Sequence, residues 1–186
     1  QIALTDDRFA KDRRNVPGYK KQSVRMPKFI QSLQRNMLEM DALDHARLRS
    51  LAHQAFSPRL IAQMQTRIHQ LAHELIDRVE AKGEMDVIRD FALPIPLTVI
   101  SEMLGVAERD RASFQRWSNV AVSVTKPIDG ILAIPTLYQL VRFLRRFLQE
   151  RRLHPQDDLT STLLQAESEN SKLSEDELIG IIGLLL

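Results

Sequence analysis

The chain has 186 residues, of which 44% are hydrophobic and 27% are charged, so it has the length and composition of one globular domain with a hydrophobic core. Its formal net charge of +2 at pH 7 says little about partners, and its lack of cysteine excludes disulfides, zinc–thiolate sites and a thiolate nucleophile within these residues. Every apolar run is too short to span a membrane, so we expect no membrane segment in this chain.

Neither end of the sequence has the signals of a natural terminus. Ile2–Phe9 has the pattern of the end of a short helix, and Gly183–Leu186 is an apolar helical stretch without a C-cap signal. Lys11–Met26 is polar and basic and contains a Pro–Gly pair, which predicts a long loop of the kind that often has a function. We therefore expect residues 1–186 to form part of one domain, truncated at both ends.

Two helices are predicted next, one over Asp44–Phe56 and one that starts at Ser57 and stops at Gly83. Ser57 and Pro58 supply an N-cap and a proline at the first helical position. The second helix carries a continuous apolar stripe, which we expect to face the core. The stripe consists of Leu60, Ile61, Met64, Ile68, Leu71, Ala72, Leu75, Ile76 and Val79. Met85–Ile88 is a candidate short strand.

The second half of the chain is also helical in its pattern. Helices are expected over Pro94–Gly105, Glu108–Val124, Pro135–Leu153 and Asp157–Ala166. The third of these should turn its apolar residues inward and its arginines outward. The inward set is Leu137, Leu140, Val141, Leu144, Phe147 and Leu148, and the outward set is Arg142, Arg145, Arg146 and Arg151. A last helix opens at Ser174 with a capping box and becomes almost wholly apolar, which predicts burial on all sides. The predicted fold class is mainly α with little strand.

A histidine and an arginine on one helix form the main candidate site. His45 and Arg49 are four residues apart, so their side chains share a face. Such a pair can bind a carboxylate or phosphate, with the arginine giving a two-pronged contact. The alternative is a solvated basic face beside Asp41 and Asp44. Arg47 points about 100° or more away from both candidate residues on a helical wheel, so we expect it at the surface.

Two other patterns favour a structural explanation. His69 and His73 are also four residues apart, which suits a metal, but no third ligand is evident and packing at the border of the apolar stripe explains them. Arg145 and Arg146 alternate with residues of helical core spacing, which favours a solvated outer face over a nucleic-acid stripe. We therefore expect neither a metal site nor a nucleic-acid partner.

The order of motifs along the chain resembles the bacterial cytochrome P450 family. Asp41–Arg49 is similar to the family's D-P-P-x-H-x-x-L-R segment on the C helix, and Ala55–Arg59 is similar to the A-F-(S/T)-P that follows it. Asp90–Val106 is similar to D-F-x-x-P-x-P-x-x-V-I-x-x-L-L-G-V, and Leu173–Leu186 resembles the start of the long I helix. The resemblance covers nearly the whole chain and implies an incomplete P450 fold, from the B–C loop region to the start of the I helix.

The resemblance also implies a function and a set of site residues. It implies a cytoplasmic haem-thiolate monooxygenase that uses haem b to insert one oxygen atom of O2 into a mostly apolar small organic substrate. His45 and Arg49 would neutralise a haem propionate, and Leu38 and Leu184 would approach the substrate cavity. A ferredoxin or flavodoxin-type electron donor would bind a proximal face made positive by Arg47, Arg49 and Arg59.

The chain departs from the family pattern in two respects. Ala42 and Leu43 stand where the family usually has Pro–Pro, which changes the local turn and leaves the histidine and arginine in place. The oxygen-activation segment A-G-x-(D/E)-T, the E-x-x-R pair and the cysteine loop belong to later parts of the family's sequence than this chain matches. We therefore expect no catalytic residue and no iron ligand within these residues, and no activity from the 186 residues alone.

A second hypothesis is a non-enzymatic all-helical protein that binds an apolar ligand, such as a transcriptional regulator. Buried helices and a long loop fit it, but no convincing recognition helix with base-reading residues is present. The residues encoded after Leu186 would separate the two, because an A-G-x-x-T continuation and a cysteine loop indicate the enzyme whereas a stop codon favours the regulator. Substrate choice would depend on Lys11–Met37 and Thr125–Ile134, which contain no interpretable recognition code.

Overall fold

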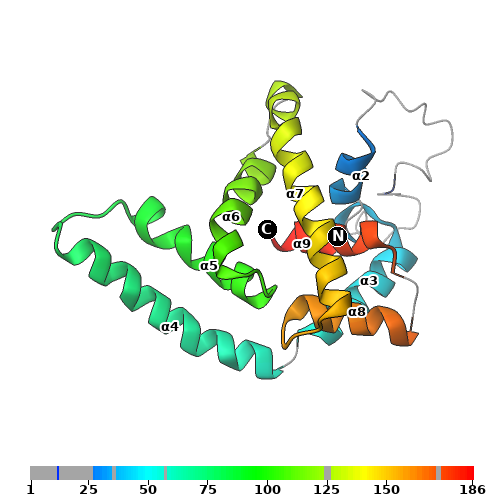
Figure 1. Cartoon of the computed structure of the whole chain (residues 1–186), viewed down its shortest axis with the longest axis horizontal. Coiled ribbons are helices and arrows are strands. Elements are labelled where there is room, and N and C mark those ends of the chain that lie inside the picture. Colours follow the sequence, from blue (N-terminus) through cyan, green and yellow to red (C-terminus); the bar gives the residue numbers. More distant parts are fainter. Residues whose placement is uncertain (1–11, 13–26, 35–36, 57, 124–126, 171–172) are drawn as a thin grey trace, which may run out of the picture.

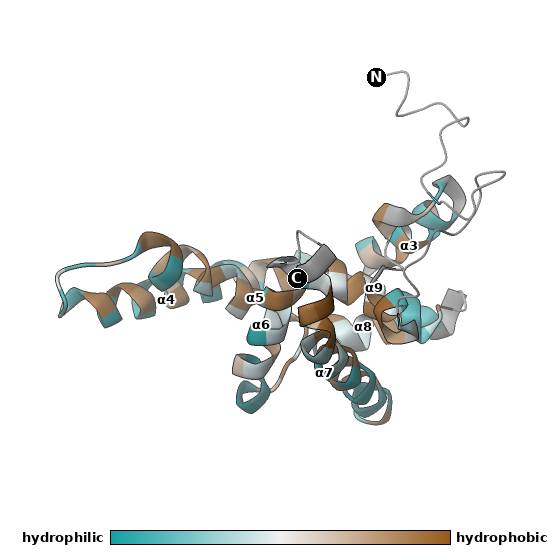
Figure 2. Cartoon of the chain, turned by 90° about the horizontal axis from the view of Figure 1, so that it is seen from above, coloured by the Kyte–Doolittle hydropathy of each residue, from teal (hydrophilic) through white to brown (hydrophobic). Residues whose placement is uncertain are grey.

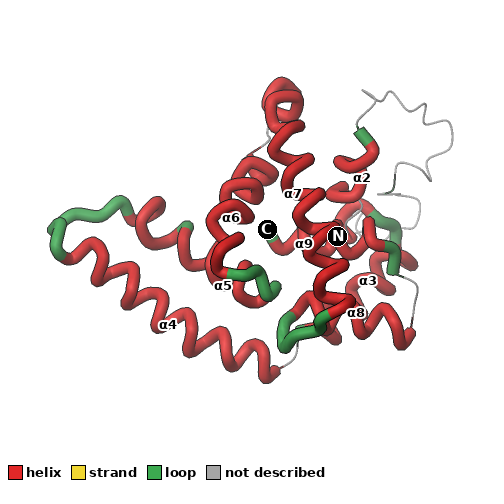
Figure 3. Tube along the Cα trace, in the orientation of Figure 1, coloured by secondary structure: helices red, strands yellow, loops and turns green. Residues whose placement is uncertain are grey.

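The computed structural model describes residues 12, 27–34, 37–56, 58–123, 127–170 and 173–186. Within these ranges the chain forms helices joined by loops and turns and contains no strand (Figure 3). In chain order the elements are α2 (Lys28–Gln34), η2 (Met37–Glu39), α3 (Ala42–Ala55), α4 (Pro58–Glu80), η3 (Val87–Ala92), α5 (Pro94–Met103), α6 (Glu108–Ser123), α7 (Pro127–Leu153), α8 (Leu159–Asn170) and α9 (Glu175–Leu185). The mainly α prediction is confirmed, while Ile2–Phe9 lies outside the described residues.

Helix α9 occupies the centre of the core, where α2 and α7 pack against it (Figure 1). It begins with the predicted capping box, in which the Ser174 hydroxyl accepts from the backbone N–H of Glu177 and the Glu177 carboxylate accepts from the backbone N–H of Ser174. Leu178, Ile179 and Ile182 are fully buried, so the prediction of a buried last helix is confirmed. Each such side chain contributes roughly 1.5–3 kcal/mol on burial, which makes α9 the natural centre of the fold.

Helix α7 turns the six apolar residues of the predicted inward set into the core, as expected. It begins at Pro127, eight residues before the predicted start, and contains Pro135 in its interior. An interior proline removes a backbone hydrogen bond and destabilises a helix. Here the neighbouring Ala133 and Leu137 are buried in a small cluster with Ile30, which offsets that loss. The segment Thr125–Ile134, on which substrate choice was also expected to depend, is therefore helical from Pro127 onward.

Two other predictions about local structure need correction. The candidate strand Met85–Ile88 is wrong, because Val87–Ala92 is a π-helical turn whose first N–H groups are capped by the carboxylate of Asp86. Lys11–Met37, the segment on which substrate choice was expected to depend, is not a loop throughout, because its part Lys28–Gln34 is a helix, α2, which packs on α9 and α7. Helix α2 is only seven residues long, so it depends on tertiary packing for its stability rather than on its own sequence.

The apolar stripe of α4 is only partly buried. Leu71 and Leu75 are buried, whereas Ile61, Ile68 and Ile76 are between 39% and 58% exposed. Helix α4 packs on α5 and η3 and extends away from the other helices, with hydrophobic residues along it (Figure 2). The prediction that the whole stripe faces the core is therefore wrong for this chain, because the stripe is wider than the contact that α5 and η3 provide. None of the helices in the described part is long and apolar enough to cross a membrane.

Candidate functional site

Helix α3 carries the predicted anion-binding pair and is fixed by its apolar face. Leu48, Leu51 and Ala55 are buried in the main core, and the helix packs on α8. His45 is half-buried and Arg49 is exposed. At 100° per residue, the two lie about 40° apart on one side of the buried stripe, so the helix presents both side chains in the same direction.

The polar groups of this pair make no side-chain contact within the part of the chain that the structure describes. Among those residues, neither the imidazole of His45 nor the guanidinium of Arg49 has a hydrogen bond or an ion pair with another side chain. An arginine brings a fixed positive charge and up to five N–H donors, and an imidazole adds a donor or an acceptor. The arrangement therefore suits an anion such as a carboxylate, with Arg49 supplying the charge and His45 a second hydrogen bond.

Arg47 lies on the opposite side of the buried stripe and differs from its prediction. Its guanidinium Nη2 lies 2.5 Å from Oε1 of Glu177 on α9 and 3.6 Å from Oδ1 of Asp44, and its side chain is 32% exposed. The expectation of a surface arginine is therefore met only in part, because the start of α9 lies beside this flank of α3 and partly covers the side chain. Helical periodicity alone showed the direction of Arg47 but not the presence of a carboxylate there.

Glu177 joins this ion pair to the cap of α9. Its Oε2 accepts from the backbone N–H of Ser174 at 2.8 Å and from the Ser174 hydroxyl at 2.9 Å, while its Oε1 binds Arg47. Burial alone would raise the pKa of the Glu177 carboxyl, but the hydrogen bonds from Ser174 and Arg47 outweigh it and hold the pKa below its ordinary value. The carboxylate is thus ionised and fixed in orientation at neutral pH.

The two predicted substrate residues lie on different elements. Leu38 is on η2 and is 54% exposed, and Leu184 is half-buried near the end of α9. Next to Leu184, the backbone of Gly183 packs closely against Leu33 of α2. A Cβ added at Gly183 would lie 3.3 Å from Cδ2 of Leu33. A groove between the end of α7 and α8 has Arg152, Thr162 and Glu167 in its lining and includes neither leucine. A shared cavity for Leu38 and Leu184 stays a prediction.

The other candidate residues are not assembled into sites. His69 and His73 are both exposed on α4, and the described residues contain no group of three or more histidine, aspartate or glutamate side chains placed to hold a metal. Of the arginines predicted on the outer face of α7, Arg142, Arg145 and Arg146 are exposed as expected. The side chain of Arg59 lies outside the described part of the structure.

The prediction for Arg151 is wrong, because this arginine is buried. Its Nε lies 2.7 Å from Oδ2 of Asp158, each side chain is 5% exposed, and its Nη2 donates to the carbonyl of Gly105. The sequence contained a signal for this, since Arg151 follows Phe147 and Leu148 by four and three residues and so lies on the inward face. A charged side chain on a face that packs into the core requires a buried partner of opposite charge. Asp158, directly before α8, is that partner.

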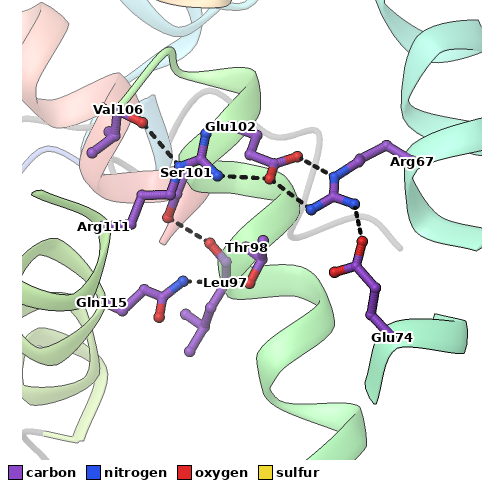
Figure 4. A network of polar contacts seen from close by, with 9 residues as sticks. All are labelled: Arg67, Glu74, Leu97, Thr98, Ser101, Glu102, Val106, Arg111 and Gln115. Atoms are coloured by element: carbon purple, nitrogen blue, oxygen red, sulfur yellow. Dashed lines mark hydrogen bonds and ion pairs between the residues drawn. The ribbon is translucent and has the colours of Figure 1, made fainter. Parts of the chain in front are cut away.

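A second polar network joins α4, α5 and α6 (Figure 4). The carboxylate of Glu102 at the end of α5 accepts two hydrogen bonds from Arg67 of α4, at 2.9 and 3.1 Å, and one from Arg111 of α6 at 2.7 Å. Arg111 also donates to the carbonyl of Val106 in the α5–α6 turn. The network fixes the mutual arrangement of these helices and is remote from α3, so we interpret it as structural.

The chain is similar to known proteins both in sequence and in structure. No family model matches the chain. It is 43% identical over 152 residues to cytochrome P450 CYP107DY1 of Priestia megaterium, covering 81% of this chain and 37% of that protein. It is 37% identical over 184 residues to the polyketide biosynthesis cytochrome P450 PksS of Bacillus subtilis, covering 98% of this chain and 45% of PksS. The solved structure of PksS matches with a TM-score of 0.83, over 98% of this chain and 44% of that one.

A third relative is the cytochrome P450 monooxygenase PikC of Streptomyces venezuelae, at 34% identity over all of this chain and 43% of PikC. The chain thus spans less than half the length of the curated relatives it matches. The match to PksS extends over nearly all of this chain, and sequence and fold agree on the same relative. The chain therefore belongs to the bacterial cytochrome P450 family, and it corresponds to a part of that family's length.

Proposed function

We propose that the protein containing these residues is a haem-thiolate monooxygenase that inserts one oxygen atom of O2 into a mostly apolar small organic molecule. One observation carries the proposal: His45 and Arg49, two hydrogen-bond donors, lie on the same side of α3. Neither has a side-chain partner among the described residues, and the chain belongs to this family. Bound haem with a thiolate ligand supplies the activation of oxygen. These 186 residues contain no cysteine, so the thiolate would have to come from residues outside them.

The donor chemistry of α3 fits a haem propionate. A carboxylate that is removed from water needs an opposite charge or hydrogen bonds, because an isolated buried carboxylate is very costly. Arg49 would give a charge-assisted, two-pronged contact and His45 a second hydrogen bond. The buried residues Leu48 and Leu51 hold α3 against the core, so both groups would be presented from a fixed helix.

Leu38 and Leu184 are our candidates for the apolar substrate cavity. Leu184 is half-buried and follows Gly183, where the backbone of α9 comes close to Leu33 of α2. Leu38 exposes half of its side chain, as a residue that lines an open cavity would. Both would hold a ligand by burial of apolar surface rather than by hydrogen bonds. PksS is named for polyketide biosynthesis, so a small molecule of the polyketide class is a candidate substrate here as well.

The electron donor would be a ferredoxin or flavodoxin that approaches the α3 side. The structure changes the expected basis of that contact, since Arg47 is paired with Glu177 and, of the three arginines, only Arg49 is both described and exposed. An acidic donor would still be attracted to α3, but the attraction would rest on fewer free charges. The reduction rate of the full-length protein should fall as ionic strength rises, and a rate independent of salt would exclude steering by charge.

The ferrous–CO spectrum of the full-length protein tests the proposal. We expect the red-shifted Soret band of a thiolate-ligated haem, and incorporation of one labelled oxygen atom from O2 into an apolar substrate. The 186-residue chain alone should not give that band, since it has no cysteine. A full-length protein that binds haem without a red-shifted band, or that binds no haem, would contradict the proposal and leave the helical ligand-binding protein as the better account.

A further inference from the structure

We propose that Arg47 is a positioning residue for His45 and Arg49, and that it acts through its ion pair with Glu177 at the start of α9. The inference rests on the proposed function, because it concerns how α3 presents its donors to a haem propionate. Arg47 itself points away from that side of α3 and would not contact the propionate.

The ion pair is the closest charged contact between α3 and α9 in the described structure. Nη2 of Arg47 lies 2.5 Å from Oε1 of Glu177, whose side chain is only 11% exposed. The competing carboxylate of Asp44 is 3.6 Å away and 61% exposed, so it is better solvated and attracts Arg47 less. Because Ser174 holds the other oxygen of Glu177, the carboxylate cannot turn to follow Arg47 if α3 moves.

The positions around α3 explain why this contact would matter. On a helical wheel, the buried residues Leu48, Leu51 and Ala55 form a stripe, with His45 and Arg49 on one side and Arg47 on the other. Apolar packing is non-directional, so the stripe resists separation of α3 from the core more strongly than rotation of α3 about its axis. The ion pair on the far side restrains that rotation.

A small rotation of α3 would be enough to spoil anion binding. A rotation of about 20° moves a side-chain head that lies about 5 Å from the helix axis by roughly 2 Å. Binding constellations have to be held to within about 0.5 Å of their productive geometry. The restraint from Arg47 would therefore keep both donors on the propionate, while Leu48 and Leu51 keep the helix in the core.

The test measures haem loss from the full-length, haem-loaded protein by transfer to excess apomyoglobin. Arg47→Ala should speed haem loss roughly tenfold, as loss of a group that orients a ligand commonly does. Glu177→Gln should act in the same direction, and Arg47→Lys, which keeps the charge, should restore part of the retention. The effects of Arg47→Ala and Glu177→Gln should not add in the double variant, because both remove one contact.

Arg145→Ala is the matched control. Arg145 also pairs with the first turn of α9, at 3.5 Å from both Glu175 and Asp176, but it comes from α7 and bridges to α9 rather than to α3. Hydrogen exchange supplies a second readout, since backbone amides of α3 should exchange faster in Arg47→Ala than in Arg145→Ala. This readout applies even if a variant holds too little haem for the transfer assay.

The outcomes separate this inference from the proposed function. If the unmodified full-length protein binds no haem, the proposed function fails. If it binds haem and Arg49→Ala weakens retention while Arg47→Ala has no effect, the propionate site stands and the positioning role is overturned. Equal effects of Arg47→Ala and Arg145→Ala would also overturn it, because the loss would then reflect a weaker start of α9 rather than a rotated α3.

Discussion

The guanidinium of Arg151 and the carboxylate of Asp158 form a buried ion pair, with Nε 2.7 Å from Oδ2 and each side chain 5% exposed. The pair lies where α7 ends and α8 begins, and it also ties in the α5–α6 turn, because Arg151 donates to the carbonyl of Gly105. Oδ1 of Asp158 accepts from the backbone N–H of Ser161, which caps α8. One buried charge pair thus joins the ends of α5, α6, α7 and α8.

Removal of one partner from this pair should destabilise the protein strongly. Arg151→Met keeps the bulk of the side chain but leaves Asp158 buried without its opposite charge, which typically costs about 3–5 kcal/mol. The neighbouring Arg152→Met is the control, since Arg152 pairs with Glu167 at the surface, where such a contact contributes about 0–1 kcal/mol. Urea unfolding measures both. Equal losses of unfolding free energy in the two variants would show that the buried ion pair contributes no more to stability than the surface pair.

Gly105 is expected to be intolerant of any side chain. Its φ of +81° is unfavourable for residues other than glycine, and a Cβ there would overlap the carboxylate of Asp158. Gly83 has a similar φ of +70°, but a Cβ at Gly83 would meet nothing within 4 Å, so this position isolates the backbone effect. Gly83→Ala should cost about 1–2 kcal/mol. Gly105→Ala should cost at least about 3 kcal/mol, since it also displaces the ion pair.

A similar loss of unfolding free energy in both alanine variants would contradict this account. It would mean that Asp158 can move away from Gly105 without loss of its contact with Arg151.

Glu177 should make stability depend on pH in the acidic range. The folded protein holds the pKa of this carboxyl below its ordinary value, so Glu177 stabilises the fold above the unfolded pKa of about 4.3, and this contribution is lost as the pH falls through the folded pKa. The difference in unfolding free energy between the unmodified chain and Glu177→Gln should therefore be largest at neutral pH and shrink below about pH 4. Glu150→Gln, which makes the same change at an exposed residue, is the control variant.

A difference that stayed constant from neutral pH to about pH 3 would show that Glu177 acts through its shape and not its charge. Other charged side chains lie around the start of α9, namely Arg47, Asp44, Asp176 and Arg145. The comparison with Glu177→Gln is therefore needed to isolate the contribution of Glu177 to the pH dependence of stability.

The two sides of the α4 stripe should respond differently to truncation. Leu75 is 5% exposed, so Leu75→Ala should cost about 2–5 kcal/mol, whereas Ile76 is 45% exposed and Ile76→Ala should cost less than about 1 kcal/mol. Thermal or urea unfolding of this 186-residue chain measures both. Comparable losses would show that Ile76 is buried in solution.

Helical periodicity predicted most of the elements but not their surroundings. It placed α9 in the core correctly because a helix that is apolar on all sides has no solvent-facing side to misassign. It failed for α4, since the pattern shows which side is apolar and not how wide the neighbouring contact is. It failed for the start of α7, because Pro135 is a helix breaker whose effect is offset by burial of its neighbours.

The candidate site was predictable to the extent that it depends on one helix. The shared face of His45 and Arg49 follows from their spacing, and α3 is present within about two residues of its expected bounds. The pairing of Arg47 with Glu177 spans 130 positions in the chain and has no local signal. The burial of Arg151 did have a local signal, namely its spacing from the buried residues Phe147 and Leu148. Its charge pointed to the surface, and the spacing was the better guide.

The most direct test of the account is haem retention in the full-length protein with Arg49→Ala. Arg49 should anchor a propionate, so its loss leaves a carboxylate short of a partner, at a cost of about 1–3 kcal/mol. The control is Arg142→Ala, an exposed arginine on α7 without a partner among the described residues. We predict that Arg49→Ala loses haem to apomyoglobin at least about fivefold faster than the unmodified protein, in line with that cost, and that Arg142→Ala does not. Equal haem loss from the two variants would contradict the assignment of α3 as the haem-anchoring helix.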